Sequence, residues 1–104
     1  MLRAVSRFIR GTKAALLWDK AEQAATEQDY GKSLSLLRSI YDLSASEMPS
    51  MDVPYGVNML CGNVASKTGD HRMAANAARM ALRQIEQDRG LSRNEKDYLT
   101  YYLL

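Results

Sequence analysis

Few side chains in this sequence are of the types that carry out chemistry. The chain contains one histidine, His71, and one cysteine, Cys61. His71 directly follows the turn signal Gly69-Asp70, where a solvated surface position is the simplest interpretation. Cys61 falls on an apolar helical face, where a buried thiol is inert. Asp19 and Glu22 are three residues apart, and a solvated charged face explains them. We therefore expect no catalytic residue and no enzyme activity.

Motifs for metals and cofactors are missing as well. One cysteine and one histidine cannot supply a zinc-ligand set within this chain. Neither a Gly-rich phosphate loop nor a His-Glu-x-x-His pattern occurs. We expect no metal and no cofactor, and a lone cysteine suits a reducing compartment.

Length and composition indicate one globular domain over residues 1–104. Hydrophobic residues make up 46% of the chain and charged residues 25%, values that argue against disorder. The longest uninterrupted apolar run, residues 14–18, is far too short to span a bilayer. No long apolar centre of a secretory signal is present in residues 1–18.

The charge is unevenly distributed although the net value is only +2. Residues 1–18 hold four basic groups and no acid, and the remainder is mildly acidic. The stretch 1–11 reads as an amphipathic basic helix, and the basic arm comprises Arg3, Arg7, Arg10 and Lys13. Three interpretations stay open: a helix that caps the domain, an arm that binds an anionic membrane surface or a partner, or an organellar presequence. A nucleic-acid role is disfavoured, since the sequence suggests no second basic patch.

Turn signals divide the rest of the chain into two helical hairpins and a final helix. The first hairpin is expected at 12–43, with a turn at 29–31, a buried face at Leu17, Ala21 and Ala24, and Trp18 at the edge. A Ser-rich loop follows at 44–53. The second hairpin is expected at 54–89 around Gly69-Asp70. The last helix, 91–104, opens with a capping box and should cap the domain.

Small residues concentrate where the two helices of the second hairpin should approach most closely. They precede and follow the turn at helical spacing, at Gly62, Ala65, Ala74, Ala78 and Ala81. A shift of 41 residues places Gln28-Asp29-Tyr30 on Gly69-Asp70-His71, and it matches Ala21 with Gly62 and Ser33 with Ala74. The two hairpins therefore read as a repeat.

This pattern resembles the tetratricopeptide repeat (TPR) family over roughly residues 14–88. The matching positions are Ala21, Asp29, Tyr30 and Ser33 in the first hairpin and Gly62, Ala65, Gly69, Asp70, Ala74 and Ala81 in the second. The family period is about 34 residues, so the 44–53 loop would absorb the excess. The usual tryptophan position holds Leu17, with Trp18 one residue later, and neither hairpin ends in the usual proline.

The resemblance implies a groove, lined by the first helix of each hairpin, that holds a peptide segment or a partner helix. Its lining here would be Trp18, Glu22, Met59, Asn63, Ser66 and Lys67. Alternatively, Trp18 and Met59 pack beneath the terminal helices and leave no groove. Only Asn63 and Lys67 match the family's carboxylate clamp, and Glu22 would repel a carboxylate, so that ligand is disfavoured.

Three tyrosines lie within five residues near the C-terminus, at Tyr98, Tyr101 and Tyr102. Successive helical residues point about 100° apart, so we expect one or two of these rings to be exposed. Exposed aromatic side chains favour interfaces, and homodimerisation through this helix is one option. The alternative is that the rings lie flat over the end of the core.

Taken together, these patterns predict an all-α domain with two TPR-like hairpins, a basic N-terminal helix and a C-terminal capping helix. The function that we expect is non-enzymatic protein–protein interaction, as an adaptor, a chaperone-like protein or an assembly factor in the cytoplasm. The alternative is a membrane-peripheral or mitochondrial protein that acts through its basic arm.

Overall fold

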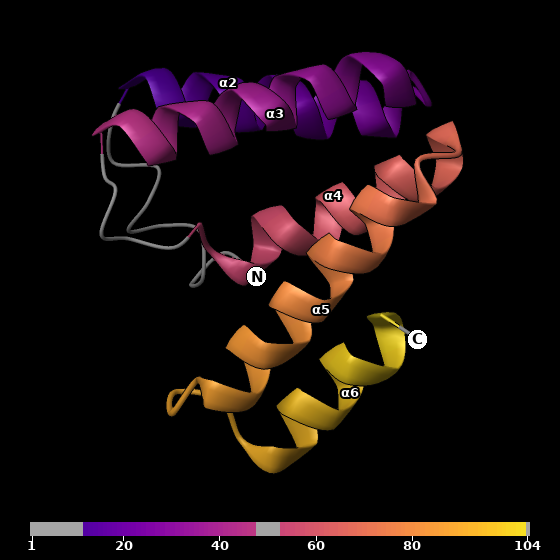
Figure 1. Cartoon of the computed structure of the whole chain (residues 1–104). Coiled ribbons are helices and arrows are strands. Elements are labelled where there is room, and N and C mark those ends of the chain that lie inside the picture. Colours follow the sequence, from indigo (N-terminus) through magenta and orange to yellow (C-terminus); the bar gives the residue numbers. More distant parts are fainter. Residues whose placement is uncertain (1–11, 48–52, 104) are drawn as a thin grey trace.

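The computed structural model describes residues 12–47 and 53–103, which form five α-helices and no strand (Figure 1). Their bounds are α2 Thr12–Thr26, α3 Tyr30–Glu47, α4 Tyr55–Thr68, α5 His71–Gln87 and α6 Arg93–Leu103. The all-α prediction is confirmed for this part of the chain. The predicted basic helix at 1–11 lies outside the described residues.

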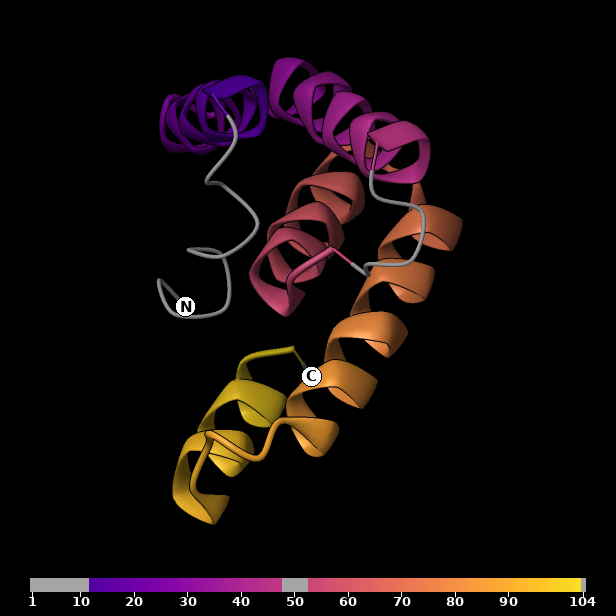
Figure 2. The ribbon, with the colours of Figure 1, turned by 90° about the vertical axis from the view of Figure 1, so that its left-hand side faces the viewer.

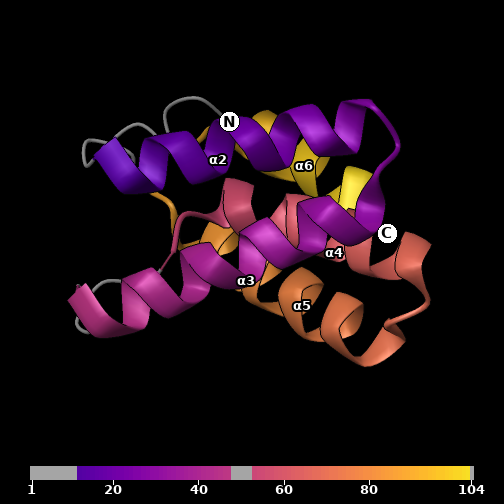
Figure 3. The ribbon, with the colours of Figure 1, turned by 90° about the horizontal axis from the view of Figure 1, so that it is seen from above.

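A short turn brings α2 and α3 together. Gln28 adopts a positive φ of 63°, and the backbone N–H of Asp29 donates to the carbonyl oxygen of Ala24 at 2.8 Å. The Asp29 carboxylate accepts from the backbone N–H of Lys32 at 3.3 Å, which caps the start of α3. Deeper in the pair, the Ser33 hydroxyl donates to the carbonyl oxygen of Ala21 at 2.8 Å. The two helices meet at this turn and diverge away from it (Figure 3).

The structure corrects one predicted boundary, because α3 continues to Glu47. Residues 44–47, predicted as loop, are the last turn of this helix. Their serines suggested a loop, but Ser44 is buried, and packing against the core keeps this turn helical.

The Gly69-Asp70 turn joins α4 to α5. Gly69 ends α4 in the left-handed conformation, with a φ of 87°, and the backbone N–H of Asp70 donates to the carbonyl oxygen of Ala65 at 2.9 Å. The Asp70 carboxylate then accepts from the backbone N–H of Met73 at 3.2 Å and caps α5. Both turn residues therefore play the roles that their types predict.

Gly62 lies where α4 and α5 approach each other. A Cβ atom built on Gly62 would lie 3.6 Å from the Ala74 carbonyl oxygen and 3.7 Å from the Ala78 nitrogen. The space next to this glycine is therefore large enough for a methyl group and too small for a branched side chain.

The helices stack so that α4 packs against α3 as well as α5, and α6 packs on α5 (Figures 1 and 2). A large apolar cluster joins α2, α3, α4 and the first half of α5, where Ala77 belongs to it; its fully buried members include Leu37, Ile40, Val57 and Val64. A smaller cluster joins α4 and α5 at Tyr55, Met59, Ala81 and Ile85, and Leu91 and Leu99 pack against it. The last helix thus covers the second cluster.

Candidate functional site

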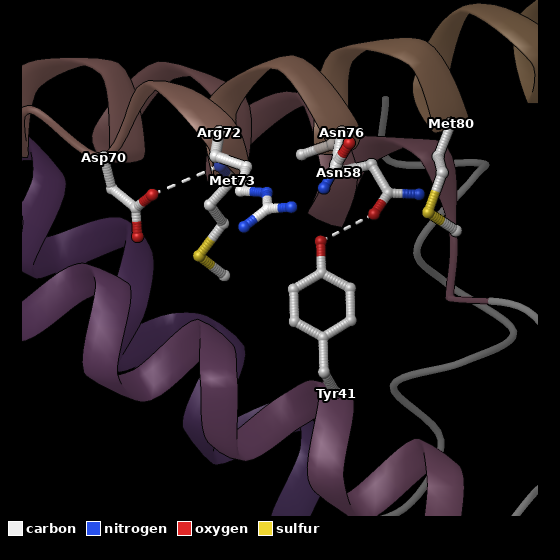
Figure 4. A pocket seen from close by; sticks show the side chains of 8 residues that line it. Tyr41, Asn58, Asp70, Arg72, Met73, Asn76 and Met80 are labelled. Carbon is white, nitrogen blue, oxygen red and sulfur yellow. Dashed lines mark hydrogen bonds between the residues drawn. The ribbon is translucent and has the colours of Figure 1, made fainter.

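A pocket of about 330 Å³ lies between α3 and α5, and Asn58 of α4 is part of its lining (Figure 4). The side chains of Met73 and Met80 point from α5 toward α3 on either side of Tyr41. The remaining lining residues are Asn58 of α4 and Asp70, Arg72, Asn76 and Ala77 of the turn and α5. Its volume lies at the lower end of the range of about 300–1,000 Å³ that ligand pockets occupy. Its lining combines two flexible thioethers with polar and charged groups.

A chain of hydrogen bonds begins in this pocket and crosses the core. The Tyr41 hydroxyl donates to the side-chain oxygen of Asn58 at 2.6 Å, and the Asn58 amide donates to Gln84 at 2.6 Å. The Gln84 amide in turn donates to the backbone carbonyl of Val53. Asn58 is completely buried, so both of its polar atoms depend on these partners. The chain therefore ties α3, α4, α5 and the residues before α4 into one arrangement.

Neither Tyr41 nor Cys61 is prepared to act as a nucleophile. Burial, and secondarily the neighbouring Cys61 thiol, raises the pKa of the Tyr41 hydroxyl far above its usual value. Burial is also the main reason why the pKa of the Cys61 thiol is raised; a hydrogen bond with Tyr41 acts in the opposite direction. Both groups stay protonated at neutral pH, as the sequence-based interpretation of Cys61 as an inert thiol expects.

Cys61 should therefore react slowly in the folded chain. Its side chain is 1% exposed, so a thiol reagent reaches it only after the helices open. We expect Ellman's reagent at mildly alkaline pH to modify the native chain at least about 100-fold more slowly than the chain unfolded in guanidinium chloride. Equal rates in the two conditions would contradict the buried placement.

The residues of the predicted groove do not form an exposed apolar platform. Trp18, which we expected at the edge of the buried face, is 7% exposed and belongs to the large core cluster. Met59 is 6% exposed and belongs to the smaller cluster, against which Leu99 of α6 packs. Met59 thus packs beneath the C-terminal helix, as the alternative without a groove expects for this residue. The two anchor side chains are parts of the core.

The other four residues of that set are exposed, on α2 and α4: Glu22, Asn63, Ser66 and Lys67. Partial burial, and secondarily the charge of Asp19, raises the pKa of the Glu22 carboxyl, and a hydrogen bond with Trp18 acts in the opposite direction. The ammonium group of Lys67 lies 5.3 Å from the centre of the Tyr30 ring, within the range of a cation–π contact. None of the four lines the pocket between α3 and α5.

Two of the predicted tyrosines are exposed on α6, in agreement with the expectation from their spacing. Tyr98 is 67% exposed and Tyr101 80% exposed, while Leu99 on the same helix packs inward. The side chain of Tyr102 lies outside what the structure describes. Of the basic arm, Arg3, Arg7 and Arg10 also lie outside the described residues, and Lys13 is exposed at the start of α2.

A second pocket, of about 550 Å³, opens where α2 and α3 diverge. Its lining includes Leu16, which is largely exposed, and Leu17 from α2, and it continues with Lys13, Ser39, Asp42, Leu43 and Ser46. Leu17 was predicted on the buried face but is only partly buried. The rotation of α2 about its axis places Trp18, the next residue, in the core instead.

Sequence reasoning missed the pocket between α3 and α5, although α5 carries a signal for it. Met73 and Met80 are seven residues apart, which places them on one face of a helix. Tyr41 follows Leu34 and Leu37 at helical spacing, which predicts a place on the buried face and gives no sign of the hydrogen bond that its hydroxyl makes. Two methionines at this spacing, of which Met73 is partly buried and Met80 exposed, are the signal that could have indicated this pocket.

Within residues 12–47 and 53–103, no group of three or more His, Cys, Asp or Glu side chains is arranged to hold a metal ion. None of the described helices is both long and apolar enough to cross a membrane. Comparisons with protein-family models, with curated proteins and with solved structures find no match to the chain.

Proposed function

We propose that the chain is a non-enzymatic protein-interaction module with a TPR-like arrangement of two helical hairpins and a capping helix. Contacts at equivalent positions support the repeat. In the first pair, Ser33 touches Ala21; in the second, Gly62 faces Ala74, and these are the positions that the 41-residue shift matches. Each pair thus has small residues at the matched positions where its two helices face each other.

The observation that carries the proposal is the exposure of two aromatic rings on α6, which we call the tyrosine face: Tyr98 and Tyr101. They are three residues apart, so they are neighbours on the helix surface. Each ring combines a large apolar area with a hydroxyl group, a combination that is enriched in protein interfaces. The function of the tyrosine face is therefore to bind another protein or a second copy of the chain.

The predicted groove contributes a smaller part to this proposal. Trp18 and Met59 belong to core clusters and are not exposed to a partner. The proposal therefore assigns the apolar contact with a partner to the tyrosine face. Glu22, Asn63, Ser66 and Lys67 remain candidates for polar contacts with a partner. Membrane binding through the basic arm is the alternative, and it depends on residues outside the described part of the chain.

Site-specific photo-crosslinking in the native cell tests the tyrosine face. A benzophenone amino acid at position 101 preserves an aromatic side chain, and the same amino acid in place of Leu16 is the control, since that side chain is also exposed. We expect crosslinked products, to a partner or to a second copy, that are abundant from position 101 and scarce from position 16. Equal yields at the two positions, with a monomer in sedimentation equilibrium, would refute the proposal.

A further inference from the structure

Three arginines form a stripe along α5, which we call the arginine stripe: Arg72, Arg79 and Arg83. Their spacings of seven and four residues place them on one side of the helix. At 1.5 Å per residue, the first two positions are about 10.5 Å apart and the last two about 6 Å apart. All three side chains are exposed.

The charges of the arginine stripe are not neutralised within the described residues. The three ion pairs found there use Arg38 and Arg93 as their cations. The one acid of α5, Glu86, lies 3.0 Å from Arg93. Arg79 donates a hydrogen bond to the neutral side chain of Asn76 at 2.6 Å, which orients the guanidinium group without cancelling its charge. The stripe is therefore available to anions.

The pocket between α3 and α5 lies directly beside this stripe. Arg72 and Asn76 belong to its lining, and Met73, Ala77 and Met80 supply an apolar floor. The negative charge at its end, Asp70, is paired with Arg38 at 3.3 Å and also caps α5. Apolar floor and cationic rim together form one surface, the arginine groove, defined by Met73, Ala77, Met80 and the arginine stripe. Figure 4 shows Met73, Met80 and the first arginine of the stripe, Arg72.

We propose that the arginine groove docks an acidic amphipathic helix of another protein. An apolar side chain of that helix enters the pocket between Met73 and Met80, and its carboxylates pair with the arginine stripe. Acidic residues at spacings of seven and four on the bound helix match Arg72, Arg79 and Arg83 when the two helices lie side by side. The proposal uses α3 and α5 and is independent of the tyrosine face.

Charge and chemistry select this occupant among the alternatives. The chain's own residues 1–18 carry four positive charges and no acid, so the stripe repels them. A nucleic acid would engage the three arginines through its phosphates, but the one aromatic ring among the lining residues, Tyr41, is partly buried and held by its hydrogen bond to Asn58. A single ring of this kind is a poor platform for the successive bases that single-stranded nucleic acids stack on their binding proteins. An apolar side chain with flanking carboxylates can fill the apolar floor and pair with the arginines at the same time. The flexible methionine side chains adapt readily to the shape of such a side chain.

Fluorescence anisotropy with a defined probe tests the proposal. The probe is a fluorescein-labelled helical peptide of about 18 residues, with glutamates at spacings of seven and four and one leucine between the first two. Comparison probes replace every glutamate by glutamine, or the leucine by serine, and a thymidine oligonucleotide of similar length represents nucleic acid. We expect saturable binding of the acidic peptide with a Kd below about 1 mM, weakened by salt and by either replacement.

Matched variants of the full chain locate the binding surface. Arg79→Gln combined with Arg83→Gln should weaken binding of the acidic peptide about tenfold, and Met80→Ser about threefold. Arg89→Gln removes one positive charge, where the double variant removes two, from an exposed position beyond α5. Tyr98→Ser with Tyr101→Ser alters the tyrosine face. Both control variants should leave the affinity within about twofold. Circular dichroism confirms that each variant is folded.

Nuclear magnetic resonance spectra recorded with the acidic peptide should show amide shifts concentrated at Met73, Asn76, Ala77 and Met80. The proposal is overturned if the acidic peptide binds no better than its glutamine counterpart, or if Arg89→Gln weakens binding as much as the stripe variant does. Tighter, stripe-dependent binding of the oligonucleotide would also overturn it, in favour of a nucleic-acid surface. Self-association lost in the stripe variant would identify a second copy of the chain as the occupant instead.

Discussion

Replacing Asn58 by leucine is expected to lower the free energy of unfolding by about 2–3 kcal/mol. Leucine has a similar size, so packing changes little, but the Tyr41 hydroxyl and the Gln84 amide each lose a hydrogen-bond partner. A polar group left without a partner in a buried site costs about 1–3 kcal/mol. For a domain of this length, the melting temperature should fall by roughly 10–20 °C, measured by calorimetry together with urea denaturation.

A double-mutant cycle with Tyr41→Phe separates this effect from a general loss of packing. Tyr41→Phe alone should cost about 1 kcal/mol, because it removes the donor to the Asn58 oxygen. The double variant should be less destabilised than the sum of the two single variants, because the hydroxyl that leucine would leave unpaired is already gone. Strict additivity would show that the two side chains are not coupled.

The second large effect is expected at Gly62, where two substitutions should change stability in opposite directions. Gly62→Ala should stabilise the fold by about 0.5–1 kcal/mol, because alanine favours the helix and its methyl group makes ordinary contacts with Ala74 and Ala78. Gly62→Leu should destabilise it by about 2 kcal/mol or more, because a branched side chain at this distance forces α4 and α5 apart. Chemical denaturation of both variants measures the difference.

Gly31 provides the matched control, since it also lies in a helix and a Cβ atom built there meets nothing within 4 Å. Gly31→Leu should therefore be neutral or mildly stabilising, as helix propensity alone predicts. If Gly31→Leu and Gly62→Leu melt at the same temperature, the small separation of α4 and α5 at Gly62 is not what limits side-chain size there.

The helices and their turns were predictable because their signals are local. Glycine followed by aspartate at 69–70 indicates a left-handed helix end and then a helix cap, and both roles are present. The end of α3 was not predictable in the same way. Its last turn contains Ser44, whose burial depends on helices that are distant in sequence, so tertiary packing overrides the loop signal of the serines.

The candidate surfaces also differ in whether local or tertiary structure determines them. The exposure of the tyrosines on α6 was predictable from the angle of about 100° between successive helical residues, which is a property of a single helix. The burial of Trp18 and Met59 did not, because it depends on which helices cover them; Leu99 of α6 packs against the cluster that contains Met59. The pocket between α3 and α5 forms only because these two helices lie next to each other. Their relative placement does not follow from the residue spacing within either helix. The arginine stripe depends on residue spacing within α5 alone, so it was predictable from the sequence. It corrects the expectation that the chain has no second basic patch, because a mildly acidic total over residues 19–104 hides three arginines on one side of one helix.

The position of α6 at the edge of the molecule has an energetic consequence. It rests mainly on α5, through Leu91 and Leu99 over the smaller cluster, so it can detach while the large apolar cluster remains folded. The same helix carries Tyr98 and Tyr101. A partner bound to those rings would hold α6 in place and raise its local opening free energy by RT ln(1 + [L]/Kd), where [L] is the concentration of free partner. Slowed hydrogen exchange confined to the amides of α6 would then report occupancy of the tyrosine face, whatever the partner is.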